Sequence, residues 1–389
     1  MDEGKTVIWF GSVFSEYHVL GNQAVSPAAN RWQHNFIRSI TDSGYNVINI
    51  GHCPERVFPF GKLFVNKKDS ISPPGINLIS SSFLNLPVLR LIEINLLSVI
   101  KVANLFRRSK NRPLIAVSYN TYAYNILPIL FVRYFKKIRW ITIIADPMFA
   151  NSDLTNPINL LADIKVFLSF KLFQESRSKR KFHFDGGISR INGLDMNLLN
   201  NNDEKIILYT GALEKYAGIE LLLEAFSLIN DNEVRLIICG KGNNDRLRRS
   251  LQSDKRISFL GMVAEQQLVE LSQKAYLFIN PRLINDKSNH SNFPSKILEY
   301  LSFCKPVIST FTDGINPDYK QVIEFVYSDD PVELAGKIKQ VISWDKSQYI
   351  EVSEKIRRYN TKYKIWPLVV SEFSKWMAGF NIISDSVQA

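Results

Sequence analysis

Two glycine turns in the second half of the chain each follow a short apolar run that is typical of a β-strand. Gly211 ends the run 206–210, and the segment Gly240–Gly242 ends the run 234–239. Such turns bring backbone N–H groups close to a bound anion, and a helix N-terminus beside them adds about half a positive charge. Lys215 stands just after the first turn, so the pattern predicts a diphosphate site. A plain tight turn with a surface lysine is the competing interpretation.

A third motif lies in the segment 292–301, where Pro294 stands near the start of a predicted helix, 294–303. A proline loses no needed N–H there, and the N–H groups of the first turn are free to hold phosphate. Glu299 lies one turn beyond Ser295 on the same face, where a carboxylate could accept both hydroxyls of a ribose. A solvated glutamate is the alternative. Its apolar neighbours favour a functional role, because a carboxylate on a core-facing helix needs a partner.

The elements that position these motifs alternate strictly between short apolar strands and helices. This order predicts a doubly wound α/β domain with a parallel sheet. The expected strands are 206–210, 234–239, 257–260, 276–280 and 306–309, and the expected helices are 219–229, 244–253, 265–274, 294–303 and 330–342.

The first half of the chain predicts a second domain of the same class. A strand at 7–10, a helix from Ser26-Pro27 to Gly44 and a strand at 45–50 form a strand–helix–strand unit, which indicates a parallel sheet. Further strands are expected at 114–118 and 140–144, with a helical segment at 124–135 between them, and 151–181 is expected to be helical and amphipathic with a basic end.

The predicted domain boundaries follow from composition. The polar segment 192–204 is the expected interdomain connection. We therefore expect an acceptor-binding domain at 1–190 and a donor-binding domain at 203–365, with a C-terminal helix, 366–380, that packs back on the first domain.

Composition limits the class of protein. The 389 residues carry a net charge of +11, which suggests an anionic partner, although solubilising surface lysine explains it equally well. The three cysteines show no metal or disulfide spacing. The N-terminus does not read as a signal peptide, and Arg90, Glu93 and Lys101 interrupt the apolar stretch 83–106, which argues against a membrane-spanning helix. We expect a cytoplasmic protein that can touch the inner face of the plasma membrane.

Basic and aromatic residues are interleaved at 131–140 and at 165–181. Such stretches suit an anionic bilayer surface. A core helix with snorkelling lysines is the alternative.

Four blocks of the second half, taken together, resemble the C-terminal domain of family 4 retaining glycosyltransferases. These blocks are 218–226, 236–242, 257–261 and 294–308, in the family's order. The resemblance is weaker in the first half. It implies the GT-B fold, in which two Rossmann-like doubly wound domains face a cleft, and a hexosyltransferase-type enzyme that uses a nucleoside-diphosphate-sugar donor with no catalytic metal and no further cofactor. It also implies a lipid-linked or oligosaccharide acceptor in bacterial surface polysaccharide synthesis (O-antigen, capsule or exopolysaccharide).

The resemblance implies roles by position. Glu299 matches the second glutamate of a Glu–seven residues–Glu motif and would bind the donor ribose. The segment 293–295 would hold the donor phosphates, and Met262 and Val263 would lie near the base. The candidate donor residues are Gly211, Lys215, Gly240, Lys241, Gly242, Met262, Val263, Arg282, Ser291, Phe293, Pro294, Ser295, Lys296 and Glu299.

The chain departs from the family pattern at three positions. Ser291 stands where the first glutamate is expected, Ala212 where a phosphate-binding arginine is expected, and Ala217 where a lysine is expected. We hypothesise that Lys215 or Arg282 supplies the missing positive charge.

On the acceptor side, Asp146 follows the strand 140–144 and is the candidate catalytic residue there, together with Glu299 on the donor side. His18, His34 and Asn120 are further candidates.

Three alternative functions remain. A non-catalytic GT-B protein that binds nucleotide-sugar or glycan in a synthase complex would explain the missing residues. An epimerase of the same fold would need acid and base carboxylates that the pattern does not offer. Nucleic-acid binding through the positive charge is the third alternative, but no nucleic-acid motif accompanies that charge.

Overall fold

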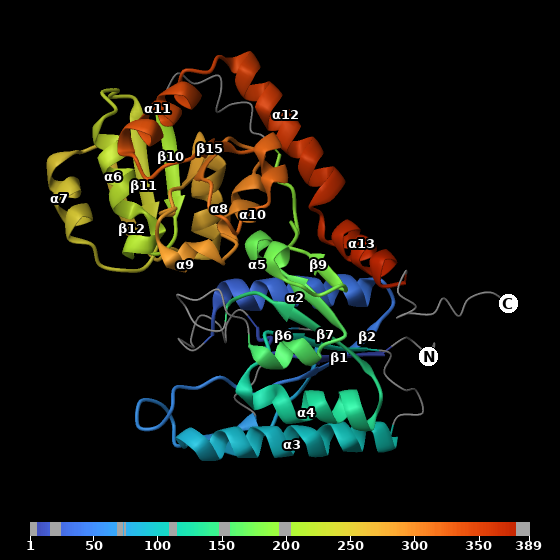
Figure 1. The fold of residues 1–389 in the computed structure, drawn as a ribbon. Coiled ribbons are helices and arrows are strands. Elements are labelled where there is room, and N and C mark those ends of the chain that lie inside the picture. The colour runs from blue at the N-terminus through green and yellow to red at the C-terminus, as the bar shows by residue number, and fades with distance from the viewer. Residues whose placement is uncertain are drawn as a thin grey trace.

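The computed structural model describes residues 6–15, 25–67, 73, 75–108, 115–147, 156–193 and 204–378. Two parallel sheets, one in each half of the chain, organise these residues (Figure 1). We call the part built on the first sheet the first domain and the part built on the second sheet the second domain. The predicted connection 192–204 lies mostly outside the described residues, which include only Asn192, Gly193 and Glu204 of it.

The first sheet has seven strands in the order β4-β2-β1-β6-β7-β8-β9, and every neighbouring pair is parallel. The reversal of order on either side of β1 is the doubly wound pattern expected from the sequence. The strands are β1 (Thr6–Phe10), β2 (Asn46–Ile50), β4 (Asn77–Ile79), β6 (Ile115–Tyr119), β7 (Arg139–Ile144), β8 (Ile164–Phe167) and β9 (Lys181–His183).

Helices cover both faces of this sheet because its strands alternate between two apolar cores. Trp9 packs on one side with α2 (Pro27–Asp42) and α13 (Trp366–Ala378), while Phe10 packs on the other with α3 (Pro87–Arg108) and α4 (Ile126–Leu130). Ser26 caps α2 with its hydroxyl, and Pro27 occupies the first helical turn, as the sequence predicts.

The expectation of a helix over 151–181 is wrong. Residues 148–155 lie outside the description, and the remainder forms a 3-10 turn (Pro157–Leu161), strand β8, the short helix α5 (Phe170–Glu175) and strand β9. Strand β8 has only four residues and pairs on both sides in the sheet. So short a buried strand carries no periodicity that separates it from a helix.

A small antiparallel pair of strands, β3 (Phe64–Val65) with β5 (Phe83–Leu84), lies beside the N-terminal end of α3. Helix α3 covers most of the apolar stretch noted in the sequence, and helix α4 continues into a π-helical turn (Phe131–Phe135). Among the described residues, none of the helices has the length and apolarity needed to cross a bilayer.

The second sheet has six parallel strands in the order β12-β11-β10-β13-β14-β15. The predicted strands and helices are confirmed, with shifts of one or two residues at their ends. The strands are β10 (Lys205–Thr210), β11 (Val234–Cys239), β12 (Ile257–Gly261), β13 (Leu277–Asn280), β14 (Val307–Thr310) and β15 (Glu324–Val326).

Six helices of the second domain follow these strands; five of them pack on the two faces of the sheet, and the short α9 lies in the loop after β13. They are α6 (Ile219–Ser227), α7 (Asp245–Ser253), α8 (Glu265–Lys274), α9 (Lys287–His290), α10 (Lys296–Leu301) and α11 (Pro331–Ile342).

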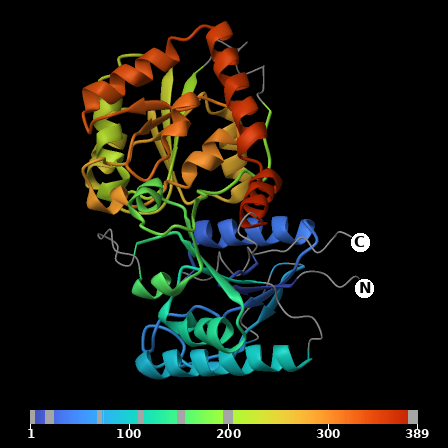
Figure 2. The same ribbon diagram turned by 45° about the vertical axis from the view of Figure 1, so that its right-hand side comes forward.

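A further long helix, α12 (Lys346–Tyr363), follows and leads into α13. The chain thereby returns from the second domain to the first, where Phe373 of α13 packs against Phe36 of α2 with ring centroids 5.9 Å apart (Figures 1 and 2). The aromatic residues Trp366 and Phe184 join the same core.

A buried polar cluster marks the point where the chain crosses between the domains. Asp185 accepts hydrogen bonds from Lys364 Nζ at 2.8 Å and from the hydroxyl of Tyr319 at 2.8 Å. Burial raises the pKa of Asp185, but Lys364 and His183 together with these hydrogen bonds lower it below its usual value. The cluster therefore joins the first domain, the second domain and the start of α13 through one carboxylate.

Candidate functional site

The turns that follow β10, β11 and β12 stack on one another at the carboxyl edge of the second sheet. Gly211 N donates to Cys239 O at 2.9 Å, and Gly240 N donates to Gly261 O at 2.8 Å. A Cβ on Gly240 would lie 1.7 Å from Gly211 O, and its φ of +153° is one that other residues rarely adopt. These glycines allow the backbones to approach, and the N–H groups of Gly211 and Gly240 donate within the chain.

Arg282 lies two residues beyond β13, beside the loop that follows β10. The guanidinium is partly buried near the hydroxyl groups of Tyr216, Tyr209 and Tyr300. Removal from water lowers the pKa of Arg282, and these phenol groups raise it. An arginine stays protonated in such a place. Within the described part of the chain its guanidinium donates to Asn289 Oδ1 at 3.5 Å, and no carboxylate pairs with it.

The loops after β10 and β13 are fastened together beneath this arginine. Gly218 has φ +75°, and a Cβ there would meet Pro281 O at 1.7 Å. Asn289 is fully buried, and its Nδ2 donates to Tyr216 O at 2.7 Å and to Leu283 O at 2.8 Å. Sequence reasoning missed Asn289, because an asparagine in a polar loop has no distinctive spacing. The fastening holds the Arg282 guanidinium close to the turn that contains Ala212.

Helix α10 lies under the ends of β10 and β11. The hydroxyl of Tyr300 accepts from Thr210 N at 2.9 Å and donates to Thr210 O at 3.1 Å. Lys296 approaches Cys239 closely enough to oppose the burial that raises the pKa of that thiol. The helix starts at Lys296, and Ser295 caps it without a side-chain hydrogen bond.

Glu299 has two cationic partners in the structure. Lys296 Nζ lies 3.1 Å from its Oε2, and Arg31 of α2, in the other domain, forms an ion pair with its Oε1. The side chain of Glu299 is 32% exposed and that of Arg31 is 50% exposed. The carboxylate that the sequence assigns to a ribose is thus occupied by an arginine from across the domain boundary. Nothing in the sequence distinguishes Arg31 from other surface arginines.

The remaining predicted donor residues fall into two groups. Ser291, Phe293 and Pro294 are buried, and Phe293 stacks on Tyr319 with ring centroids 5.9 Å apart. The side chains that are exposed along the same edge are Lys215, Lys241, Met262 and Ser295, with Gly242 also exposed and Val263 partly buried.

The carboxyl edge of the first sheet carries a different polar group. Asn120 has φ +46° just after β6, and its Nδ2 donates to Asp146 Oδ2 at 3.1 Å and to the hydroxyl of Tyr122 at 3.0 Å. Asp146 is accessible to solvent at this edge. The protein packed around its carboxyl raises its pKa, and the Asn120 hydrogen bond partly opposes that rise. His34 lies partly buried on α2, and His18 lies outside the described residues.

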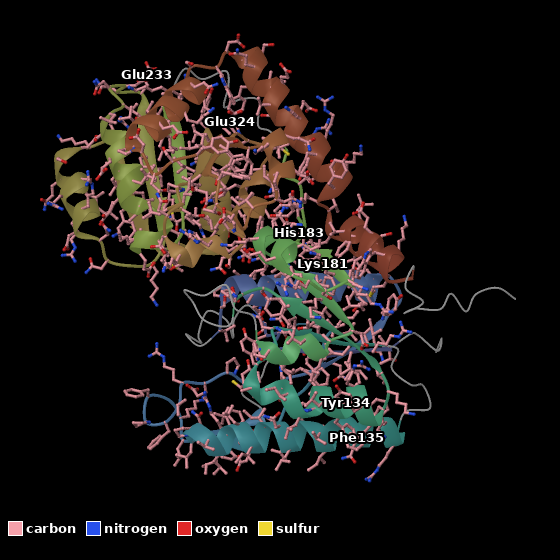
Figure 3. All side chains as sticks on the ribbon, viewed as in Figure 1. Tyr134, Phe135, Lys181, His183, Glu233 and Glu324 are labelled. Atoms are coloured by element: carbon pink, nitrogen blue, oxygen red, sulfur yellow. The ribbon has the colours of Figure 1, made fainter. Side chains whose placement is uncertain are left out.

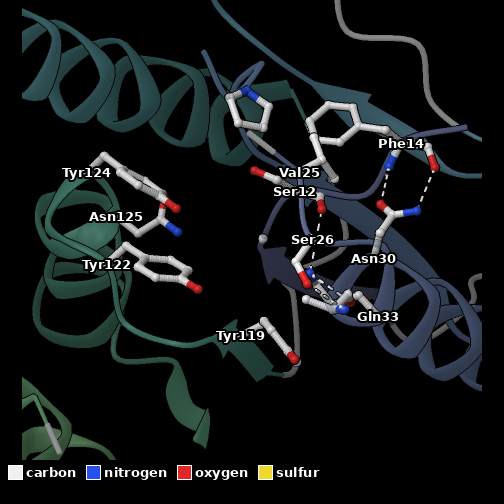
Figure 4. A pocket seen from close by; sticks show the side chains of 13 residues that line it. Ser12, Phe14, Val25, Ser26, Asn30, Gln33, Tyr119, Tyr122, Tyr124 and Asn125 are labelled. Carbon is white, nitrogen blue, oxygen red and sulfur yellow. Dashed lines mark hydrogen bonds between the residues drawn. The ribbon is translucent and has the colours of Figure 1, made fainter. Parts of the chain in front are cut away.

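A pocket of about 140 Å³ opens beside this group (Figure 4). Tyr122 and Tyr124 line one side and Ser12 and Ser26 the opposite side. The amides of Asn30 and Gln33 in its wall are hydrogen-bonded to the chain itself. Hydroxyl-bearing side chains therefore line both sides of the pocket.

Residues 204–343 match the family model of Glycosyl transferases group 1, which covers the second sheet and its loops. An uncharacterized glycosyltransferase of Methanocaldococcus jannaschii is 27% identical over 179 residues, which are 44% of each chain. The aligned part thus spans less than half the length of that relative. The match and the relative support a glycosyltransferase.

Solved structures match almost the whole chain. Anabaena HepE in complex with UDP has a TM-score of 0.66 at 13% identity, with 96% of this chain and 100% of that one covered. The lipopolysaccharide outer core galactosyltransferase WaaB has a TM-score of 0.63 at 13% identity, with 96% and 99% covered. At this identity the likeness shows the fold, and the expected GT-B fold of two Rossmann-like domains is confirmed.

Proposed function

We propose that this chain is a retaining glycosyltransferase that moves a hexosyl group from a nucleoside-diphosphate-sugar to a lipid-linked or oligosaccharide acceptor in surface polysaccharide synthesis. The proposal rests first on Arg282. Its partly buried guanidinium has phenol and amide neighbours and no carboxylate partner among the described residues. A diphosphate would supply the missing negative charge, because buried charges in proteins are paired.

Arg282 also answers the gap at Ala212. The family resemblance expects a phosphate-binding arginine in the turn after β10, and here that turn carries alanine. The hydrogen bonds from Asn289 to the carbonyl oxygens of Tyr216 and Leu283 hold the loop after β13 against that turn. We infer that Arg282 takes over the charge from the neighbouring strand, with Lys215 and Lys241 as exposed cations at the rim.

The reaction would take place between the two edges. The bond between the anomeric carbon and the diphosphate oxygen breaks, the acceptor hydroxyl oxygen bonds to the anomeric carbon, and the hydroxyl gives up its proton to Asp146. Arg282 would stabilise the charge that develops on the leaving diphosphate. The pocket lined by Tyr122 and Tyr124 would hold the acceptor, with Asp146 as the nearby carboxyl whose raised pKa suits proton exchange.

Two proteins of similar structure support the donor and the product in this proposal. HepE was solved with UDP, which favours a nucleoside diphosphate as the donor's leaving group. WaaB is described as a lipopolysaccharide outer core galactosyltransferase, which favours a cell-surface glycan as the product. No additional cofactor and no catalytic metal enter the proposed reaction. We propose that the protein works in the cytoplasm, at the inner face of the membrane.

The decisive experiment is a thermal-shift panel of nucleoside diphosphates on the wild type, Arg282→Met and Arg256→Met. Arg256 is the matched control, since it is also partly buried in the second domain but pairs with Asp254 next to the start of β12. A ligand at 100 times its Kd adds about 2.7 kcal/mol of stability. We expect one diphosphate to stabilise the wild type and the control, and Arg282→Met to bind it about 10–100-fold more weakly.

Each other result has a defined meaning. If no nucleoside diphosphate stabilises the wild type, the donor site proposed here is wrong. If a nucleotide binds but the matching sugar donors are neither transferred nor hydrolysed, the chain is the non-catalytic binder. The anomeric configuration of a transferred sugar, measured by NMR, tests the retaining course.

A further inference from the structure

Helix α3 exposes an apolar face to solvent. Val88, Ile92, Leu96 and Ile100 follow one another at every fourth position and are between 50% and 69% exposed. A surface helix of a globular protein normally turns such a stripe toward the core and its charges toward water. We call these four side chains the α3 stripe.

The charged residues in the first four turns of α3 face the protein. Arg90 donates to Glu55 O at 3.2 Å, and Glu93 Oε2 accepts from Leu84 N at 2.7 Å. Lys101 donates to Ser80 O, and burial followed by repulsion from Lys67 lowers its pKa to about 8. The helix is therefore apolar on two sides, because Ile94 and Val102 are buried in the protein while the α3 stripe faces solvent. A contiguous apolar surface of this kind in a soluble protein marks an interaction site.

The segment 58–64, which leads into β3, extends the apolar surface at the N-terminal end of α3. Phe60 is 83% exposed, and Phe58, Leu63 and Phe64 beside it are also exposed. Asn85, just before the helix, ties this segment down through hydrogen bonds from its Nδ2 to Arg56 O at 2.5 Å and to Lys62 O at 2.8 Å. The aromatic side chains are thus presented by a fastened segment.

The C-terminal end of α3 has a similar border. Tyr134 and Phe135 are exposed there, near the end of α3 (Figure 3). Lys136 Nζ lies 5.1 Å above the ring of Phe106, which joins this turn to the helix. Basic residues that are exposed or partly exposed border both ends of the surface. They are Arg56, Lys62 and Lys67 in and beside the segment 58–64, and Arg107, Lys136 and Lys137 by the C-terminal end of α3.

We propose that the α3 stripe and the segment 58–64 dock this protein on an anionic bilayer surface. An apolar strip bordered by cations matches a membrane interface, where apolar side chains enter the acyl boundary and Lys and Arg contact acidic headgroups. A second copy of the chain fits less well, because two stripes laid together bring basic borders against basic borders. Views from two sides place α3 at the end of the first domain farthest from the second domain (Figures 1 and 2).

The surface includes one of the two basic stretches noted in the sequence and leaves out the other. In the segment 165–181, Lys181 Nζ donates to Phe173 O and Ser176 O, and Lys171 pairs with Asp313 of the second domain. Arg177, Lys179 and Arg180 of the same segment are exposed, but they lie between α5 and β9, on the side of the first domain away from α3 (Figure 1). The turn 131–137, by contrast, borders α3 and forms part of the proposed surface.

The position also relates the membrane to the acceptor pocket. Pro54 lines that pocket, and the segment 58–64 with its exposed aromatic residues begins a few residues later. An acceptor with a lipid carrier would therefore meet the pocket beside the docked segment. This step rests on the proposed function, whereas docking itself does not.

The test is vesicle co-sedimentation, with phosphatidylcholine vesicles that contain or lack phosphatidylglycerol. The stripe variant carries Ile92→Ser, Leu96→Ser and Ile100→Ser. The matched control is Val332→Ser, an exposed apolar residue of α11 that is 64% exposed. We expect the wild type and the control to bind the anionic vesicles, and the stripe variant to bind roughly tenfold or more weakly. Lys62→Ala and Lys67→Ala should each weaken binding roughly fivefold, and added salt should do the same.

Two results would overturn the proposal: a wild type that ignores anionic vesicles, or a stripe variant that binds them as the wild type does. A stripe variant that changes only a concentration-dependent dimer in size-exclusion chromatography would overturn it in favour of self-association. Nucleoside diphosphate thermal shifts on the same variants report on the donor site alone. Unchanged shifts with lost vesicle binding separate docking from the proposed function.

Discussion

The carboxyl edges of the two sheets differ in what they offer a ligand. At the second sheet, successive glycine turns are stacked by backbone hydrogen bonds, and Arg282 lies among phenol groups with no carboxylate partner among the described residues. At the first sheet, tyrosines border an open pocket, and the charged group is Asp146. One edge is suited to an anion and the other to a neutral, hydroxyl-rich ligand. This difference favours a donor on the second domain and an acceptor on the first.

The two edges meet through contacts from both domains. Phe170 N, at the start of α5, donates to Gly314 O at 3.0 Å, and Lys171 lies 3.6 Å from Asp313. Arg31 reaches Glu299 from α2. All three contacts come from segments that follow strands at their carboxyl ends, so a ligand of one edge lies near the other edge.

Gly240→Ala should have the largest effect, because the stacked edge has no room for a Cβ there. The new atom would lie 1.7 Å from the carbonyl oxygen of Gly211, which is backbone and cannot turn aside. We expect a loss of about 3 kcal/mol in the free energy of unfolding. Urea denaturation measures it.

Gly261→Ala is the matched control on the same edge. Gly261 has φ +66°, but a Cβ there would meet nothing within 4 Å. Its cost should be about 1–2 kcal/mol, the ordinary cost of a left-handed conformation. If the two variants lose equal stability, the stacking of the turns contributes nothing, and the glycines serve the ligand alone.

His52 should give the first domain an acid sensitivity of intermediate size. The ring is buried under the pocket, 4.1 Å from the ring of Tyr124, and its Nδ1 has no hydrogen-bond partner in the described structure. Burial, and then repulsion from Arg90, lower its pKa from 6.5 to about 4. Between these values the unfolded chain binds the proton and the folded chain does not, so stability rises with pH across that window.

The expected loss on acidification from pH 7 to the folded pKa is about 3 kcal/mol. Comparison of the wild type with His52→Gln isolates this loss, because every other titratable group, the carboxylates included, is present in both proteins. The wild type should lose stability more steeply between pH 6.5 and 4. Parallel stability curves would mean that the ring is hydrated or paired in solution.

The second domain could be predicted from the sequence more fully than the first. Its strands are apolar runs that end at glycine, and β11 lies at Val234–Cys239 as predicted. Helix α12 was missed because its buried stripe includes Tyr349, Ser353 and Asn360, which do not form an apolar repeat. Strand β8 was taken for helix because four residues in the middle of a sheet show no period.

The candidate site could be predicted only in part, for a physical reason. The turns and the helix α10 follow from local patterns, since glycine and proline limit the backbone where they stand. Arg282 came into question only as a substitute for a missing charge. Asn289 and Arg31 depend on how loops and domains meet, and no local spacing encodes such contacts. The role of every predicted donor residue stays a prediction until a nucleotide is bound.

The Arg31–Glu299 ion pair should have the smallest effect on stability and the most informative effect on binding. Both side chains are substantially exposed, and a surface pair of this kind contributes at most about 1 kcal/mol. If Glu299 binds the ribose, Arg31 competes with the nucleotide for the same carboxylate. Arg31→Ala should then raise nucleoside diphosphate affinity up to about fivefold. Arg38→Ala, on the same helix but paired with Asp42, should change nothing.

The double variant decides what the pair does. In a Glu299→Ala background, Arg31→Ala should have no effect on nucleotide affinity, because the competition has been removed. If Arg31→Ala lowers affinity in both backgrounds, the arginine itself contacts the nucleotide, and the first domain contributes to the donor site. The two edges would then share one ligand, and the division into an anion-binding edge and a hydroxyl-binding edge would no longer hold. Isothermal titration of the four proteins with the diphosphate found in the thermal-shift panel distinguishes these cases.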